Sequence, residues 1–355
     1  EHVGWEDVWG TSAESPAFRA AAAVEAQLAL RHRREVLDHV GSQRWSLDQF
    51  LASEPADWQH TSGRDNYTSA EVQVGKRCHG FHMELLASDI TPTASHYQLI
   101  HYDIPALDPD RHRVALCGAV DRPRSLSLAE LKALPAESHA VLMACAGTGR
   151  AQQRYRLWTH VPWGPDSIGC AVWTGTPLAA VLAAAGPLPA AAQVVFSGAD
   201  KGVEKGKVQY YERSMTLEEA MRGHVLLVYA MNGEALPPAH GAPVRLIVPG
   251  WYGCASVKWL TKIEVRTDQD PWWGPQMANY CFKRTAADPG VPLQQLPVRA
   301  LMAPPGIPDF VSRTRLVPPG TVLVKGKAYC GAQEIARVEF SSDNGASWRA
   351  PPGQP

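Results

Sequence analysis

The chain has 355 residues, of which 45% are hydrophobic and 19% are charged, so it can bury a large core and fits two domains. Its 34 Lys and Arg residues nearly balance its 35 Asp and Glu residues, which leaves a formal net charge of -1. This balance gives no electrostatic case for nucleic acid or an anionic membrane surface as a partner. No apolar run reaches the length of a membrane span.

Residues 1–75 are predicted to form a partly helical N-terminal extension that wraps the main domain. Ser15 and Pro16 suit the cap and first position of a helix that continues to Leu37. Glu1 is not an initiator methionine, so the start is expected to be processed or trimmed, and a soluble protein in either the cytoplasm or the periplasm fits. No HPGG-type signature occurs, so we expect no heme to be encoded.

Residues 76–268 are typical of a strand-rich α+β domain, because glycine and proline mark many turns and few segments are long enough for extended helices. Ser127 and Glu130 predict a capping box at a helix start, and Asn232-Gly233 predicts a hairpin turn. Strands are predicted at 96–101, 113–118, 141–144, 194–196, 225–231 and 244–249, and a helix at 178–185.

The segment 141–150, VLMACAGTGR, carries the candidate reactive thiol. Its apolar start predicts a short buried strand, which delivers Cys145 into a turn of small residues closed by Arg150. A neighbouring cation favours the thiolate, the form that binds metals or acts as a nucleophile. From these residues alone an inert, buried thiol is the alternative. The seven cysteines are scattered without a CxxC pair, which argues against a thiolate zinc site and favours reduced thiols.

The remainder is predicted to be an aromatic linker at 269–295 and a β domain at 296–355. Alternating strands are predicted over 322–329 and 335–341, with a tight turn at 343–345 before Trp348. This pattern is typical of an immunoglobulin-like sandwich, which needs roughly 100 residues. The sequence supplies fewer, so we expect a truncated or unusually small sandwich.

Several ordered motifs resemble the sulfite oxidase family of molybdopterin enzymes, over roughly residues 80–348. The resemblance implies a mixed, strand-rich molybdopterin-binding core followed by a partial immunoglobulin-like dimerisation domain, and hence a homodimer. The motifs that carry it are CAGTGR (145–150), WTGTPL (173–178), SGAD (197–200), YERS (211–214), MNGEALPPAHGAPVRLIVPGWYG (231–253) and SVKWL (256–260).

The resemblance also implies a molybdenum–molybdopterin cofactor, with Cys145 as the single protein thiolate on the metal. The catalytic set would be Cys145, Tyr211, Arg150 and Asp200. The cofactor-binding set would be His101, His240, Arg245, Ser256 and Lys258. A packed aromatic role for Tyr211 and a snorkelling role for Lys258 stay open as structural alternatives.

Two departures from the family pattern concern the anion site. Leu99 stands where the family has an arginine that holds sulfite, and Gly149 stands where it has the first of two arginines. Two positive charges are therefore missing. Four other cations could compensate: Arg154, Arg213, Lys205 and Lys207.

The resemblance implies two-electron oxygen-atom transfer with a small sulfur-containing substrate, and electrons passed to an external acceptor such as a cytochrome. Two alternatives stay open. The same cofactor could act on a less anionic substrate such as a sulfoxide, because of Leu99. The chain could also bind the cofactor without turnover.

Overall fold

The computed structural model describes residues 77–152, 161, 163–204, 206–270, 272, 274, 280–285, 287–309 and 314–350. The predicted N-terminal helix, Arg154 and Lys205 lie outside this part of the chain. Within it, strands dominate and helices are short, as predicted. No helix in these ranges is both long and apolar enough to cross a membrane.

The first sheet has five strands in the order β10-β9-β6-β5, with β11 paired to β9. The strands are β5 (Glu137–Ala144), β6 (Ile168–Pro177), β9 (Leu226–Met231), β10 (Glu234–Ala235) and β11 (Arg245–Ile247). All pairings are antiparallel, and β5 runs along β6 from Glu137↔Gly175 to Ala144↔Ile168. The predicted hairpin joins β9 to β10, with Asn232 at φ 53° and Gly233 at φ 82° as its turn type requires.

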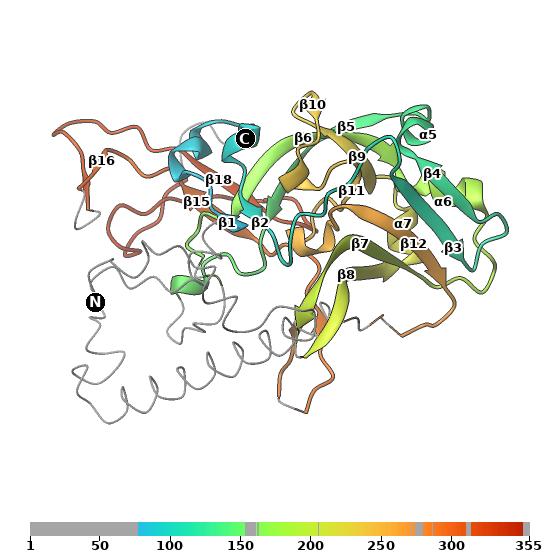
Figure 1. Cartoon of the computed structure of the whole chain (residues 1–355). Coiled ribbons are helices and arrows are strands. Elements are labelled where there is room, and N and C mark those ends of the chain that lie inside the picture. Colours follow the sequence, from blue (N-terminus) through green and yellow to red (C-terminus); the bar gives the residue numbers. More distant parts are fainter. Residues whose placement is uncertain are drawn as a thin grey trace, which may run out of the picture.

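The second sheet has the order β4-β3-β12-β7-β8. Only β3 and β12 run parallel, so this sheet is mixed. The strands are β3 (Arg113–Gly118), β4 (Arg124–Ser127), β7 (Gln193–Glu204), β8 (Lys207–Thr216) and β12 (Leu260–Arg266). Figure 1 shows the two sheets at one end of the molecule and the C-terminal strands at the other.

Three short α-helices join these strands: α5 (Leu128–Lys132), α6 (Leu178–Ala185) and α7 (Leu217–Met221). The predicted capping box of Ser127 and Glu130 begins α5, and Thr216 with Glu219 forms a second one at α7. The 3-10 helices are η2 (Met83–Ala87), η3 (Thr93–Ser95), η4 (Arg150–Gln152), η5 (Pro238–His240) and η6 (Gly253–Ala255).

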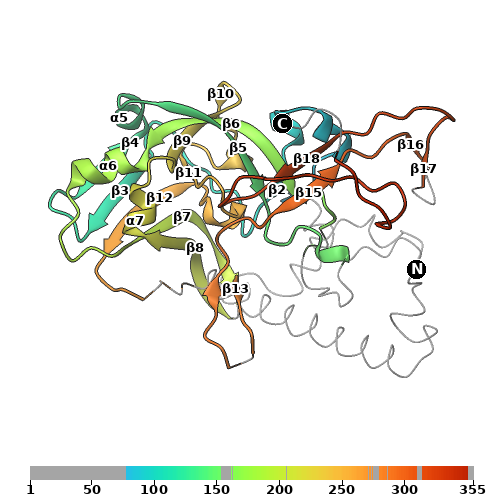
Figure 2. The ribbon, with the colours of Figure 1, turned by 180° about the vertical axis from the view of Figure 1, so that it is seen from behind.

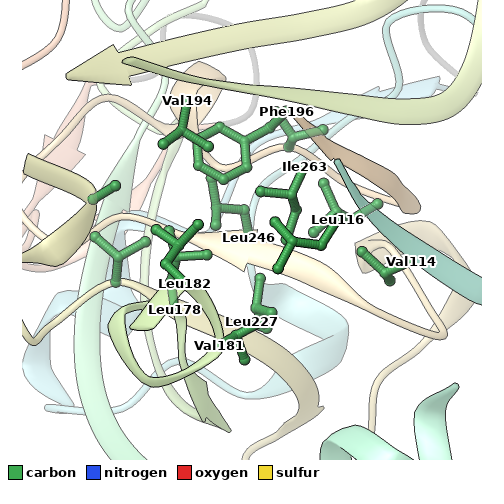
Figure 3. Close-up of a cluster of buried hydrophobic side chains, with 14 of the residues drawn as sticks. Val114, Leu116, Leu178, Val181, Leu182, Val194, Phe196, Leu227, Leu246 and Ile263 are labelled. Atoms are coloured by element: carbon green, nitrogen blue, oxygen red, sulfur yellow. The ribbon is translucent and has the colours of Figure 1, made fainter. Parts of the chain in front are cut away.

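The main core lies between the second sheet, α6 and the inner strands of the first sheet (Figure 3). Phe196 of β7 is fully buried, and truncating such a side chain to alanine costs about 3–5 kcal/mol. Both sheets contribute to this cluster, so they are held together by it. Its labelled members are Val114, Leu116, Leu178, Val181, Leu182, Val194, Phe196, Leu227, Leu246 and Ile263.

The remaining strands are short and form two-stranded pairs. They are β1 (Cys78–His79) with β2 (Gln98–Leu99), β13 (Cys281–Phe282) with β14 (Val291–Pro292), β15 (Arg299–Met302) with β18 (Gly326–Tyr329), and β16 (Ile307–Pro308) with β17 (Arg315–Leu316). In both views β15 and β18 lie beside η2 (Figures 1 and 2). Leu296 and Tyr329 bury there against Phe81 and Leu86.

The predicted strands of the C-terminal domain are present only in part. Of 322–329 only β18 is a strand, and 335–341 keeps a single bridge, Phe340 to Arg349. Leu323 is 77% exposed and Trp348 is 60% exposed, because no second sheet covers them within the described residues. The immunoglobulin-like sandwich, and the domain boundaries at 76, 269 and 296, therefore stay predictions.

Candidate active site

A cavity opens at Cys145, where the end of β5 meets β7, β8 and the loops on either side of β11. With the open solvent at its mouth included, its empty volume is about 730 Å³. Eight of the nine site residues predicted from the sequence line it: Cys145, His101, Asp200, Tyr211, His240, Arg245, Ser256 and Lys258. Leu99 also lines it, as expected for a residue on the same face of its segment as His101.

Cys145 directly follows β5 and is held by backbone contacts on both sides. Its N–H donates to the carbonyl of Ser167 at 2.9 Å, and Thr148 Oγ1 donates to its carbonyl at 2.7 Å. The N–H of Gly147 points at the sulfur, 3.4 Å away. A Cβ on Gly147 would lie 2.6 Å from Arg150 Nη2, so this turn needs its small residue. The thiol is thereby fixed at the cavity wall.

Burial raises the pKa of the Cys145 thiol to about 11. The Gly147 N–H and the charge of Arg150 lower it, but by less. The neighbouring cation thus favours the thiolate, as predicted, but in the chain without a bound metal desolvation outweighs this effect and the thiol stays protonated. A metal ion that binds here must displace a proton. All seven cysteines are free thiols, as predicted.

Arg150 is the predicted site residue that does not line this cavity. It begins η4, and its guanidinium lies next to Gly147 of the cysteine turn. Its Nη1 donates to the carbonyl of Val161 at 3.1 Å. Its position in the sequence, five residues after Cys145, placed it near the thiol but not in the cavity. The anion-binding role expected of it consequently has no direct geometric support.

Arg245 is a buried cation that only uncharged groups hold in place. It is 4% exposed, and its nitrogens donate to the carbonyls of His240 at 2.8 Å, Ser256 at 2.9 Å and Leu246 at 3.3 Å. Its guanidinium lies 5.0 Å from the ring centroid of Trp173. Burial lowers the pKa of Arg245 to about 10, so the group stays charged at neutral pH.

Lys258 is a second cation on the cavity wall. Its ammonium donates to the carbonyls of Leu99 at 2.8 Å and Ala239 at 3.0 Å, and it lies 4.4 Å from the ring centroid of Trp259. Burial, helped by Arg245, lowers the pKa of Lys258 to about 7. Among the residues that the structure describes, no carboxylate forms an ion pair with either cation. The cavity therefore carries excess positive charge, which an anion would balance.

Three histidines and one aspartate also line the wall: His96, His101, His240 and Asp200. Burial lowers the pKa of His96 to about 4 and that of His240 to about 3, so both imidazoles are neutral. Burial raises the pKa of Asp200 to about 6. His96 Nε2 and Asp200 Oδ1 are buried without a hydrogen-bond partner. Such atoms are costly unless a ligand or water satisfies them.

Three tyrosines line the cavity: Tyr97, Tyr211 and Tyr280. The Tyr211 hydroxyl donates to the carbonyl of Cys254 at 2.7 Å, so its proton is engaged by the backbone. Tyr280 was not predicted as a site residue, because it lies in the irregular linker, although the aromatic content of that segment indicated that it packs on something. His96 and Tyr97 were also missed, since their short segment showed no motif.

The ligand set limits how a metal could bind. In the described ranges, no group of three or more His, Cys, Asp or Glu residues could hold a metal ion. A metal at Cys145 would therefore need most of its ligands from a non-protein group. One soft sulfur, two buried cations and unsatisfied polar atoms fit a metal carried by an anionic organic ligand.

Comparisons with known proteins agree with this chemistry. A family model described as the oxidoreductase molybdopterin binding domain matches residues 101–273. The chain is 34% identical to sulfite oxidase of Gallus gallus, over 76% of this chain and 62% of that protein. It is 32% identical to sulfite oxidase of Arabidopsis thaliana, over 74% and 70%. It is 30% identical to nitrate reductase [NADH] of Ulva prolifera, over 74% and 32%.

A solved structure, the sulfane dehydrogenase SoxCD from Paracoccus pantotrophus, shares the fold with a TM-score of 0.64. The likeness covers 84% of this chain and 75% of that chain at 21% identity. The chain spans 62% of the length of the Gallus gallus relative and about half of the Homo sapiens one.

Proposed function

Because this chain belongs to the sulfite oxidase family of molybdopterin-dependent oxidoreductases, we propose that it holds a molybdenum cofactor in the cavity at Cys145. There it would transfer an oxygen atom to or from a small sulfur compound. The observation that carries the proposal is that one cavity joins a fixed thiol and two buried cations, Arg245 and Lys258, neither of which forms a salt bridge with a carboxylate of the described residues.

The residues of the wall divide between the metal and the organic part of the cofactor. Cys145 would supply the protein sulfur ligand, after loss of its proton. Arg245 and Lys258 would bind the phosphate, while His240 and the Ser256 segment would contact the pterin. His101, whose ring lies 5.7 Å from that of Tyr211, would help to close the cavity around the cofactor. When bound, the cofactor supplies the two-electron redox chemistry and the transferable oxygen.

The protein groups beside the metal position would handle protons and substrate. The Asp200 carboxyl has a pKa of about 6, so it can hold or release a proton near neutral pH at Oδ1, which has no other partner. Tyr280 would donate a hydrogen bond to the substrate, because its hydroxyl-bearing ring lines the cavity and the Tyr211 hydroxyl is already engaged. Electrons would leave one at a time to an external acceptor such as a cytochrome, and residues 296–355 would mediate a homodimer.

One specific observation favours a second candidate. Leu99 lines the cavity where the family pattern has an arginine, so a less anionic substrate such as a sulfoxide also fits. The two candidates share the cofactor and differ in the charge that the cavity must accept.

The test is metal and pterin analysis of protein purified from a host that makes the cofactor, followed by sulfite oxidation with an artificial one-electron acceptor. We expect about one molybdenum and one pterin per chain, and sulfite-dependent reduction of the acceptor. Another metal, or no pterin, would refute the cofactor. A fully loaded protein without turnover on sulfite or a sulfoxide would indicate a cofactor-binding protein instead.

A further inference from the structure

Arg213 is a buried cation that the proposed cofactor site does not use. It lies on β8, is 2% exposed, and ranks with Trp173 and Phe196 among the largest fully buried side chains. Its Nη1 has no hydrogen-bond partner, and its Nη2 makes one long contact of 3.3 Å to the carbonyl of Leu293. No carboxylate of the described residues forms an ion pair with it.

Burying the Arg213 guanidinium in this way lowers the stability of the folded chain, and packing alone does not call for a charged residue here. A buried charge without an ionic partner is disfavoured, and a methionine of similar length would fill the same space without that cost. A group kept at such a cost is a candidate for function, provided that its charge reaches a site.

The charge of Arg213 does reach the cavity. Arg213 and Tyr211 are two apart on one strand, so both side chains lie on the same face of the sheet, and Tyr211 lines the cavity. The guanidinium lies 5.8 Å from the ring centroid of Tyr280, which also lines it. Burial raises the pKa of Tyr211, Tyr280 and Cys254, and the charge of Arg213 acts against this at all three. At Tyr280 the charge of Arg150 acts in the same direction and more strongly, so Arg150 is the competing cation that the test must exclude.

We propose that Arg213 is the positioning residue that makes this cavity select anionic substrates, acting from behind Tyr280 in place of the charge that Leu99 does not provide. This inference rests on the proposed function, and it narrows the substrate class to small sulfur oxyanions. Arg245 and Lys258 are assigned to the cofactor, so their charge is balanced when it is bound. Arg213 keeps its charge uncompensated and available to a second anion.

The expected effect follows from electrostatics. A unit charge one side chain behind the cavity wall, in a medium of intermediate dielectric, changes the affinity for a doubly charged anion on the order of tenfold to a hundredfold. The turnover number should change little, because the group does not touch the reacting atoms. Added salt should weaken substrate binding less in the absence of Arg213 than in its presence.

The test compares Arg213→Met and Arg213→Lys with the wild-type holoprotein at equal molybdenum and pterin content. For Arg213→Met we expect the KM for sulfite to rise ten- to a hundredfold, kcat to stay within threefold, and the KM for the artificial acceptor to stay unchanged. Arg213→Lys should recover most of the affinity. Leu99→Arg in the Arg213→Met background should also lower the KM again, since that side chain lines the cavity. Arg222→Met, which removes an exposed charge, is the matched control.

A binding readout separates this inference from the proposed function. Sulfate should raise the melting temperature of the wild-type protein and should do so less for Arg213→Met, whether or not the cofactor is present. The molybdenum and pterin content of the wild-type protein tests the proposed cofactor independently of Arg213. Arg213→Met should not lower the melting temperature in the absence of sulfate, because it removes an unpaired buried charge.

Three results would overturn the inference. An unchanged sulfite KM and sulfate response in Arg213→Met, together with a lower melting temperature, would show that Arg213 is structural. Failure of Arg213→Lys to recover affinity would show that charge is not the cause. A rise in KM in Arg150→Met alone would assign the role to Arg150.

Discussion

Replacement of Arg245 by methionine should separate cofactor binding from folding. The pKa of Arg245 falls from 12.5 to about 10, and 2.5 pKa units correspond to roughly 3 kcal/mol of unfavourable burial at neutral pH. Below pH 10 the group is charged in both the folded and the unfolded chain, so this cost is fully present there. Arg245→Met removes the cost, and it also removes three hydrogen bonds to carbonyls, worth about 1 kcal/mol each. The two effects nearly cancel.

We therefore expect cofactor-free Arg245→Met to unfold within a few degrees of the cofactor-free wild type. In the loaded protein the same change removes a buried cation from an anionic ligand, which costs about 2–5 kcal/mol. Cofactor retention should then fall at least tenfold. The measurements are thermal unfolding of protein from hosts with and without cofactor synthesis, and pterin content after gel filtration. Arg113→Met, at an exposed ion pair, is the control. A large loss of stability in the cofactor-free variant with normal cofactor retention would refute the reasoning.

Four further substitutions test the cavity wall. Cys145→Ser should abolish turnover and leave the melting temperature within a few degrees, because a hydroxyl is a poor ligand for a soft metal but fits the same space; full activity would return the thiol to an inert role. Leu99→Arg should lower the sulfite KM about tenfold, measured by steady-state kinetics, because it adds a cation to the wall; an unchanged KM would mean that the new side chain avoids the cavity. Tyr280→Phe should reduce kcat/KM roughly tenfold to a hundredfold through loss of a hydrogen-bond donor. Tyr211→Phe should lower kcat/KM less than threefold and the free energy of unfolding by about 1 kcal/mol, since its hydroxyl binds a backbone carbonyl. Equal losses of kcat/KM in Tyr280→Phe and Tyr211→Phe would contradict the separate roles given to these two tyrosines.

Local features were predictable because neighbouring residues determine them. The capping box at Ser127 and the Asn232-Gly233 turn depend on residues at most three apart, and both are present. The predicted C-terminal strands were only partly found, since an alternating pattern forms a strand only where a partner strand is available. The segment 335–341 has none within the described residues.

The cavity-lining residues that belong to a recognised motif were predictable from the sequence, and the others were not. Tyr280, His96 and Arg213 come from segments without periodicity or known spacing, so only the folded chain shows that they meet. Arg150 was assigned through the family resemblance. Its guanidinium bonds to Val161 and does not line the cavity, but its charge acts on Cys145 and Tyr280, which do, so its catalytic role stays a prediction. The direction of the Arg150 effect on the Cys145 thiol was predictable from the sequence. The larger effect of burial on its pKa was not, because burial depends on the whole fold.

The contacts that close the cavity join parts of the chain that are far apart in sequence. Lys258 reaches the carbonyl of Leu99 across 159 residues, and Tyr211 reaches that of Cys254 across 43. Contacts of such separation carry a large loop-closure entropy and form late in folding. The cavity should therefore exist only after both sheets have docked. A nascent or partly folded chain could not retain the cofactor, so its insertion is expected to follow folding.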